Sequence, residues 1–347
     1  MTRLFLLLFL SCTLGCTETS ESPTGPPPEF VISGETMGTT YTIRLADLSD
    51  GETLESIQVA VDEELVTVNQ QMSTYIDDSE LSRFNTSTSD DWFPVSTELV
   101  DVVKLALSIS DMTNGKYDVT VGPLVNLWNF GPNPMPQEIP TDDEIATALS
   151  HVGFENLSVR EDPPALKKSN PDLYVDLSSI AKGHGVDRIA SVLDSLDVSA
   201  YMIEIGGEVR TRGSKVGGSF WRIGVENPAS KPGDVISIVP LENQSLASSG
   251  DYRNFFDVDG VRYSHTIDPT TGRPIVHDTT AVSVIADTCA EADAWATAIL
   301  VLGANYTDTL SSDNNLGVLL INRVDNGLVL ESNAQFTANQ DRSNTAK

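Results

Sequence analysis

The segment from residue 290 to residue 302 is almost wholly apolar, yet it carries two side chains that could do chemistry. From Ala292 onward its polar residues are Asp293 and Thr297. They stand four positions apart, which places them on one face of a helix. A buried carboxylate is costly without a partner, and a carboxylate beside a hydroxyl suits a hard cation such as Mg²⁺. The alternative is structural: Asp293 bonds a neighbouring backbone group and Thr297 bonds back to its own helix.

A second segment, residues 176–185, combines a carboxylate, two serines, a lysine and two glycines. Its order predicts a strand end, a helix capped by Ser178 or Ser179, and Lys182 in the first helical turn. A lysine there opposes the positive end of the helix dipole. We therefore expect Lys182 and the helix N-terminus to bind an anion together. The alternative is that Lys182 is solvated and Asp176 is a helix cap.

A third segment places His265 directly before a turn rich in aspartate and threonine, which ends at Gly272. A histidine in that position is a candidate general base, although lone histidines are more often structural. Two glycine-rich pieces, residues 33–39 and 205–208, are weak indications alone, because glycine at strand ends is commonly a turn or a bulge.

The composition limits the class of protein. The chain has 347 residues and 40% hydrophobic content, enough for a sizeable core in two subdomains or one large domain. Its 21 basic residues against 50 acidic ones give a formal charge of −29. Such a field opposes binding to nucleic acid or to anionic lipid. A bound phosphate must then be neutralised locally, and a divalent cation is suited to that task.

The first sixteen residues predict export. Arg3 and the apolar run at residues 4–10 indicate a secretory signal, too short to span a bilayer. Residues 13–16 resemble a bacterial lipoprotein cleavage box with Cys16 as the lipidated residue, while Cys12 ends a weaker competing box. An ordinary signal peptide with incidental cysteines is the remaining alternative. With Cys16 lipidated, Cys289 is the other cysteine of the mature chain, so no intramolecular disulfide can form.

Residues 17–29 are rich in Ser, Thr, Pro and Glu and predict a flexible linker that spans at most about 45 Å. Residues 333–347 are similarly polar and predict a loose tail. The body of the chain is therefore expected at 30–332.

Elements predicted within this body position the candidate residues. Apolar spacing predicts helices at 54–72, 98–113, 142–150, 179–196 and 289–302. Strands are predicted at 40–45, 173–177, 200–205, 221–225, 235–241, 246–249 and 281–286, followed by a hairpin of 318–321 and 328–331. A proline-rich loop is expected at 132–140. Strands and helices do not alternate regularly, which favours an α+β fold over a doubly wound sheet.

Seven segments in this order resemble the ApbE family of flavin transferases, over a stretch from about Gly34 to Gly303. The matching segments are residues 36–39, 72–75, 115–124, 176–183, 204–208, 265–272 and 293–297. The resemblance implies an α+β fold of two related subdomains, built of mainly antiparallel sheet packed with helices.

The resemblance also implies roles for individual residues. Family members contact FAD at the positions of Met37, Tyr75, Lys116, Tyr117, Asp118, Asp176, Lys182 and Ile267. The Mg²⁺ positions correspond to Ser179, Asp293 and Thr297, with Ser179 acting through its carbonyl oxygen. His265 falls at the catalytic base. Lys116 stands where a small residue is common, so we expect its contact from the backbone.

We therefore expect a Mg²⁺-dependent FAD:protein FMN transferase that attaches FMN to a Thr or Ser of a redox membrane-protein subunit and releases AMP. An FAD pyrophosphatase that uses water as acceptor, and a lipid-anchored flavin-binding protein without activity, remain open. Neither the charge pattern nor the motifs favour a solute receptor. The predicted location is the periplasmic side of the inner membrane, although Thr17 after the lipidated cysteine favours outer-membrane sorting.

Overall fold

The computed structural model describes residues 29–132, 138–252, 254–258, 260–306 and 308–345. The predicted signal peptide, Cys16, nearly all of the linker and part of the proline-rich loop lie outside these residues. Within the described ranges no helix has the length and apolar character needed to cross a bilayer.

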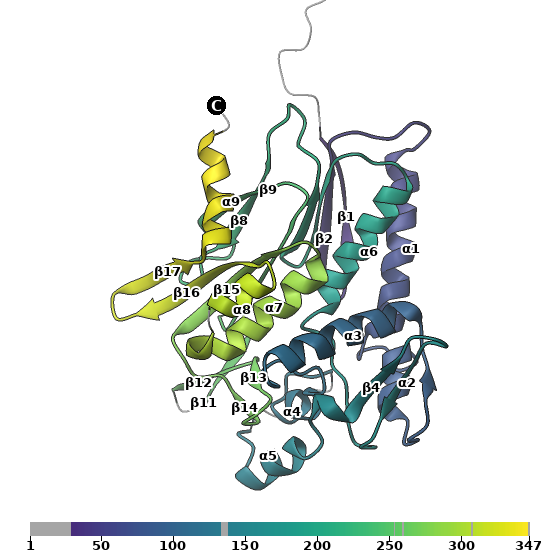
Figure 1. Cartoon of the computed structure of the whole chain (residues 1–347), viewed down its shortest axis with the longest axis vertical. Helices are drawn as coiled ribbons and strands as arrows, with labels where there is room; N and C mark the ends of the chain where they lie inside the picture. Colours follow the sequence, from purple (N-terminus) through teal and green to yellow (C-terminus); the bar gives the residue numbers. More distant parts are fainter. Residues whose placement is uncertain (1–28, 133–137, 253, 259, 307, 346–347) are drawn as a thin grey trace, which may run out of the picture.

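One antiparallel sheet of eight strands organises the described chain (Figure 1). Each strand pairs antiparallel with its neighbours, which confirms the α+β class and its mainly antiparallel sheet. The division into two related subdomains stays a prediction. In sheet order the strands are β1 (Phe30–Thr36), β2 (Thr39–Leu45), β6 (Tyr201–Ile205), β7 (Glu208–Arg212), β10 (Ser245–Gly250), β15 (Thr279–Ala286), β16 (Gly317–Val324) and β17 (Gly327–Ser332).

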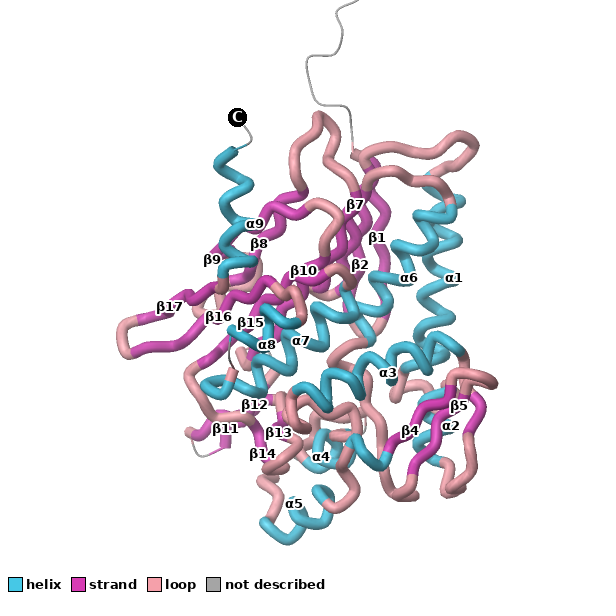
Figure 2. The backbone as a smooth tube through the Cα atoms, viewed as in Figure 1, coloured by secondary structure: helices cyan, strands magenta, loops and turns pink. Residues whose placement is uncertain are grey.

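The longest helices lie on one side of this sheet (Figure 2). Apolar residues of α1 (Leu54–Met72) and α6 (Ala181–Ser195) pack with those of β1, β2 and β6. Helix α7 (Cys289–Leu302) packs on β10 and β15, and α3 (Thr97–Met112) contacts α7. Because α7 lies between the sheet and α3, it is buried nearly all round, which explains its apolar sequence.

The opposite face of the sheet is covered by the hairpin of β8 (Trp221–Glu226) and β9 (Val235–Leu241) and by α9 (Ala334–Thr345). Strand β15 shows the consequence of this two-sided cover. Val282 and Val284 pack in the α7 cluster, whereas Ala281 and Ile285 pack with the β8–β9 hairpin. A strand covered on both faces reads as a continuous apolar run rather than an alternating one.

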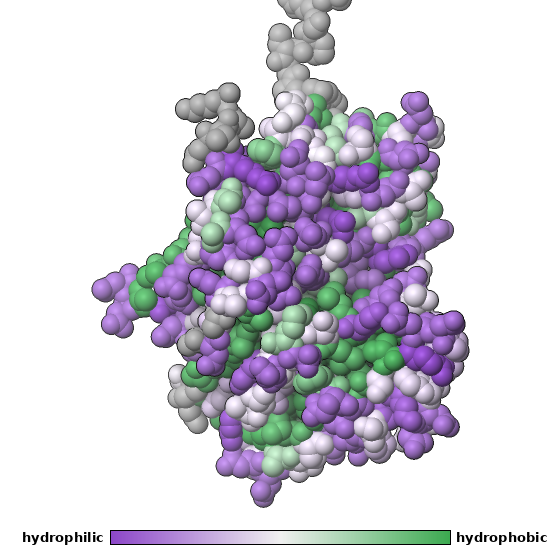
Figure 3. Space-filling model, viewed as in Figure 1, coloured by the Kyte–Doolittle hydropathy of each residue, from purple (hydrophilic) through white to green (hydrophobic). Residues whose placement is uncertain are grey.

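Smaller elements complete the chain around the helical side. The strand segments are β3 (Phe93–Pro94), β4 (Leu157–Arg160), β5 (Ala165–Lys168), β11 (Phe255–Val258), β12 (Val261–Ser264), β13 (Ile267–Asp268) and β14 (Arg273–Pro274). The helical segments are α2 (Glu80–Thr86), α4 (Gly122–Leu127), α5 (Asp142–Leu149), η1 (Phe154–Asn156), η2 (Gly303–Asn305) and α8 (Asp308–Asp313). The molecular face in Figure 3 is mostly hydrophilic, as the acidic composition requires.

The strand predicted at 173–177 is wrong. Tyr174 forms a single bridge to Val121 there, and the segment is otherwise irregular. Its backbone groups find other partners: the Asn85 side chain donates to the Val175 carbonyl at 2.8 Å and accepts from the Val175 N–H at 2.8 Å. A buried asparagine 90 residues away thus replaces a neighbouring strand.

The predicted start of the next helix is also corrected. Helix α6 begins at Ala181, and its N-cap residue, Ile180, makes no side-chain capping hydrogen bond. Ser178 and Ser179 lie in the turn before it. The Asp176 carboxylate accepts the Ser178 N–H at 2.8 Å, so it holds this turn rather than the helix.

The loose tail predicted at 333–347 is wrong as well, because most of it forms α9. Phe336 is fully buried against the β8–β9 side of the sheet. The Asn333 side chain accepts the Phe336 N–H and the Val318 N–H, each at 3.0 Å, and thereby fixes the helix start to β16. The segment is polar because the helix buries a narrow face.

Candidate functional site

A cavity of the described chain lies where two central strands part. Strands β7 and β10 pair through Val209 with Leu246 and Arg210 with Ser245. Directly beyond these pairs, Glu208 and Ser248 line a cavity of about 390 Å³, a size typical of small-molecule sites. The antiparallel sheet therefore opens at this point, and α6 and α7 supply the adjoining wall.

Most of the residues predicted for the site line this one cavity. They are Lys116, Tyr117, Asp118, Asp176, Ser179, Lys182, His265, Ile267, Asp293 and Thr297. Met37 and Tyr75 are not in the lining. The Met37 side chain lies against Gly185 of α6, and Tyr75 is 71% exposed to solvent. Their contact with FAD stays a prediction.

Asp293 occupies the wall formed by α6 and α7. The residue is 2% exposed, and its Oδ2 accepts the N–H of Gly183 at 3.0 Å. The first N–H groups of a helix lack partners within the helix and carry partial positive charge. The anion expected at the α6 N-terminus is therefore supplied within the chain itself, by the carboxylate of Asp293.

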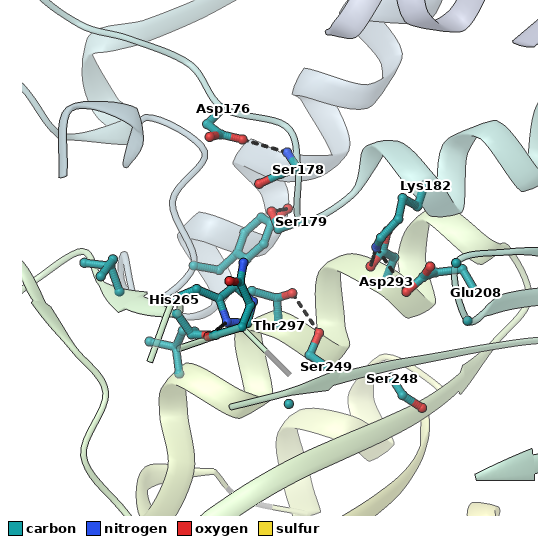
Figure 4. A pocket seen from close by; sticks show the side chains of 18 of the residues that line it. Asp176, Ser178, Ser179, Lys182, Glu208, Ser248, Ser249, His265, Asp293 and Thr297 are labelled. Carbon is teal, nitrogen blue, oxygen red and sulfur yellow. Dashed lines mark hydrogen bonds and ion pairs between the residues drawn. The ribbon is translucent and has the colours of Figure 1, made fainter. Parts of the chain in front are cut away.

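Lys182 lies between two buried carboxylates (Figure 4). Its Nζ is 3.1 Å from Oε1 of Glu208 and 3.6 Å from Oδ1 of Asp293. Burial raises the pKa of Glu208, and the Lys182 ammonium opposes that rise. Oε2 of Glu208 is buried without a hydrogen-bond partner among the described residues. Two carboxyl groups thus face one ammonium. When both are ionised, the excess negative charge is one that a further cation would balance.

Hydroxyl groups complete this wall. Thr297 Oγ1 lies 2.9 Å from Ser249 Oγ on β10, so it bonds across to the sheet rather than back to its own helix. Ser179 donates to the Tyr117 hydroxyl at 3.0 Å. Within the described ranges, no group of three or more His, Cys, Asp and Glu side chains is arranged to hold a metal ion. One carboxylate with hydroxyl and carbonyl oxygens fits Mg²⁺, which keeps several water or phosphate ligands.

Lys116 and Asp118 hold the loop after α3 in place. Lys116 Nζ lies 2.7 Å from Asp268 Oδ2 and 2.7 Å from Thr270 Oγ1, which ties this loop to the β13–β14 hairpin. Asp118 accepts the N–H and the hydroxyl of Thr120 and the N–H of Phe154. Burial raises the pKa of Asp118 to about 6. Both charged groups are engaged within the protein, so a ligand here would meet chiefly backbone and the Tyr117 ring.

His265 follows β12 on the other side of the cavity from Lys182 (Figure 4). Its Nδ1 lies 2.9 Å from the carbonyl oxygen of Asn254. A carbonyl only accepts, so Nδ1 carries the hydrogen and Nε2 is the basic nitrogen. Burial lowers the pKa of His265, and the positive charge of Lys182 acts in the same direction, while the Asn254 carbonyl opposes it. The neutral imidazole required of a base is thus favoured.

Sequence reasoning missed the part played by Glu208 and Ser249. Glu208 ends a glycine-rich piece noted in the sequence, but its carboxylate drew no prediction. The left-handed backbone of Gly206 (φ 60°) and Gly207 (φ 111°) turns the chain between β6 and β7 and brings Glu208 to Lys182. Ser249 sits in an ordinary strand, and its approach to Thr297 depends on how α7 lies on β10.

The fold and the cavity define an α+β protein with an oxygen-rich site suited to a cation and a phosphorylated ligand. The model of the ApbE family matches residues 37–320. An FAD:protein FMN transferase of Vibrio cholerae is 44% identical over 311 residues, covering 90% of this chain and 92% of the relative. One from Haemophilus influenzae is 42% identical, covering 88% and 90%.

Solved structures agree with these relatives. The flavin transferase ApbE from Vibrio cholerae has a TM-score of 0.82 at 43% identity, covering 90% of this chain and 99% of that one. The apo form of the Pseudomonas stutzeri flavinyl transferase ApbE also has a TM-score of 0.82, at 34% identity, covering 92% and 99%. The chain belongs to the ApbE family.

The crossing of α6 and α7 predicts different effects for two neighbouring glycines. A Cβ at Gly183 would lie 2.3 Å from the backbone oxygen of Cys289, whereas one at Gly185 would meet the flexible end of Met37 at 2.9 Å. Helix propensity alone favours alanine at either position by about 1 kcal/mol. We expect Gly183→Ala to lower the free energy of unfolding in urea by about 1–3 kcal/mol, because the backbones must separate. Gly185→Ala is the matched control, with an expected change within about 1 kcal/mol. Equal effects of the two variants would contradict the close crossing.

Proposed function

We propose that this protein is a Mg²⁺-dependent FAD:protein FMN transferase, which moves FMN from FAD to a Thr or Ser hydroxyl of a protein and releases AMP. The observation that carries the proposal is the oxygen-rich wall of Asp293 and Thr297, one helical turn apart and beside Lys182. Membership of the ApbE family, whose relatives carry this activity in their names, supplies the flavin substrate.

The charges of the cavity suit this reaction. A Mg²⁺ ion, when bound, would neutralise pyrophosphate charge and stabilise the charge that develops during transfer. Asp293, Thr297 and the carbonyl of Ser179 are the groups that would hold it. Lys182 adds a fixed positive charge for the phosphates, and the buried side chains of Tyr117 and Ile267 offer apolar surface to the flavin.

The transfer step assigns a proton to His265. The acceptor hydroxyl oxygen forms a bond to the phosphorus of the FMN half, the bond from that phosphorus to the AMP oxygen breaks, and AMP leaves. The hydroxyl proton passes to Nε2 of His265, which is the free ring nitrogen because Nδ1 bonds Asn254. The product is FMN joined to protein by a phosphodiester.

Two other functions use the same cavity. With water in place of the hydroxyl, the protein would be an FAD pyrophosphatase, and AMP would appear without an acceptor. A flavin-binding protein without activity would bind FAD unchanged, with an affinity indifferent to Mg²⁺. The family favours transfer, since the relatives above are named as transferases to protein.

The proposal is tested by an incubation of the purified chain with FAD, Mg²⁺ and a redox subunit that carries a Thr or Ser acceptor site. We expect covalent flavin on the acceptor by in-gel fluorescence and an equal amount of AMP. Asp293→Ala should lower the rate at least about a hundredfold, because a ligand of the charge-neutralising cation is lost. Asp111→Ala, an exposed change on α3, is the control. If the parent chain leaves the acceptor unmodified, or if Asp293→Ala keeps full activity, the proposal of a Mg²⁺-dependent transferase is wrong.

The pH dependence of the rate tests His265. The histidine must be neutral to act as a base, and its pKa is lowered from the ordinary value of about 6.5. The neutral form therefore persists to lower pH, and kcat/KM should fall only below about pH 6.5. His265→Ala should lose this acid limb and about 10²–10⁴-fold in rate. Rates of AMP release from about pH 5 to about pH 8 measure it, and a limb centred above the ordinary value would argue against His265 as the base.

We also propose that the chain is a lipoprotein on the periplasmic side of the inner membrane, joined through Cys16, where its acceptor subunits would lie. Cys16 is outside the described residues, and the support comes from the signal and cleavage box in the sequence. Cys16→Ser should move the protein from the membrane fraction to the soluble periplasmic fraction, whereas Cys12→Ser should not. Membrane retention of Cys16→Ser, or co-fractionation of the parent with outer-membrane markers, would refute this location.

A further inference from the structure

Glu208 is a buried carboxylate for which the transfer step above has no use. Its side chain is 3% exposed, its Oε1 lies 3.1 Å from Lys182 Nζ, and its Oε2 has no hydrogen-bond partner within the part of the chain that is described. Buried polar atoms are nearly always satisfied, and an exception calls for a reason. Glu208 also lines the cavity, so the reason lies in what the cavity holds.

The two carboxylates beside Lys182 are not equivalent. Asp293 has another donor, the N–H of Gly183, and stands farther from Lys182, at 3.6 Å against 3.1 Å for Glu208. Asp293 is also the carboxylate that a divalent cation would use. A cation at Asp293 and the Lys182 ammonium therefore compete for the same oxygen, Oδ1.

Removal of Glu208 would change this competition. Among the ion pairs of the described residues, Lys182 would then have Asp293 alone as a carboxylate partner. A buried ammonium needs a counter-charge. The Lys182 ammonium would therefore move closer to Oδ1 of Asp293 and weaken the binding of a cation to that oxygen. It would also leave the position from which it can meet a phosphate.

A second general base is a poor description of Glu208. Figure 4 shows Glu208, Lys182 and Asp293 together at one side of the cavity and His265 at the other. The Gly206–Gly207 turn sets Glu208 against the ammonium rather than against the basic nitrogen of His265.

We propose that Glu208 is a positioning residue that holds Lys182 away from Asp293, which leaves Asp293 Oδ1 free for a divalent cation and the Lys182 ammonium free for a phosphate. The proposal rests on the proposed function, because it takes Asp293 as the cation ligand. Beyond that function, the proposal states that Glu208 keeps the Lys182 ammonium and the divalent cation apart without contacting the bonds that form and break.

Binding of Mn²⁺, followed by the electron paramagnetic resonance of the free ion, tests this without FAD or turnover. The proteins are the purified chain and its variants Glu208→Gln, Lys182→Met and Glu208→Gln/Lys182→Met. Glu64→Gln is the matched control, since Glu64 is also an ion-paired and largely buried glutamate, with Arg188, but lies outside the cavity.

We expect Glu208→Gln to weaken Mn²⁺ binding about tenfold, the scale of one charged hydrogen bond. The double variant should regain the parent affinity within about threefold, because no ammonium remains to compete for Asp293. The KM for FAD with Mg²⁺ should rise in Glu208→Gln, also about tenfold, with a smaller change in kcat. Glu64→Gln should match the parent in all three measurements.

A stabilising ion pair without a positioning role gives another pattern: Glu208→Gln melts at lower temperature but binds Mn²⁺ like the parent. That result, or a double variant as weak as Glu208→Gln, overturns the proposal. Should Glu208→Gln fail to fold, Lys182→Met alone decides: tighter Mn²⁺ binding than the parent supports the proposal, and equal or weaker binding overturns it.

The outcome separates this proposal from the proposed function. A parent chain that flavinylates its acceptor, with Glu208→Gln unchanged in Mn²⁺ affinity, defeats the positioning role alone. A parent that leaves FAD and acceptor unchanged, with the expected Mn²⁺ pattern across the variants, defeats the transferase assignment alone. A parent that binds no Mn²⁺ defeats both.

Discussion

The close crossing of α6 and α7 at Gly183 is the constraint on which the site depends. The absence of a side chain lets the backbone of α6 approach Cys289, and the Gly183 N–H then reaches Asp293. A second contact fixes the same crossing in the reverse direction. The carboxylate of Asp187 on α6 accepts the N–H groups of Cys289 and Ala290 at the start of α7, at 2.9 Å each. Asp187 also pairs with Arg210. Each helix therefore caps the start of the other with a carboxylate.

This crossing decides where charge can be placed. Helix α7 is buried by the sheet and by α3, so Asp293 cannot turn to solvent, and its charge must be met locally. Lys182 meets part of it from the first turn of α6, and Glu208 shares the lysine from β7. The parting of β7 from β10 leaves room in front of these groups. An open wall with two buried carboxyl groups, inside an acidic protein, is a setting in which a bound cation would favour the binding of a phosphate.

The opposite wall of the cavity is held by side-chain contacts between loops that are far apart in the sequence. Lys116 joins the loop after α3 to Asp268 and Thr270, about 150 residues later in the chain, and the same hairpin carries Ile267 two residues after His265. The site thus unites α6 and β7 from the middle of the chain with α7 and β10 from its second half, so its geometry depends on the whole fold. Agreement in overall fold with flavin transferases of 34% and 43% identity is consistent with that dependence.

The sequence by itself determined the elements whose periodicity is local. The helices at 54–72 and 289–302 have the predicted bounds. The first shows a 3.6-residue apolar repeat, and the second is a continuous apolar run too long for an ordinary strand. Asp293 and Thr297 could also be singled out, since two polar residues in an apolar helix are visible without a structure. Other features were decided by the tertiary structure alone. The backbone at Val175, in the strand expected at 173–177, pairs with the Asn85 side chain instead of a neighbouring strand. The polar C-terminal segment forms α9, whose Phe336 is buried against the sheet. The tertiary structure also placed Glu208 beside Lys182. These outcomes depend on contacts between distant segments, and the local spacing of residues carries no record of such contacts.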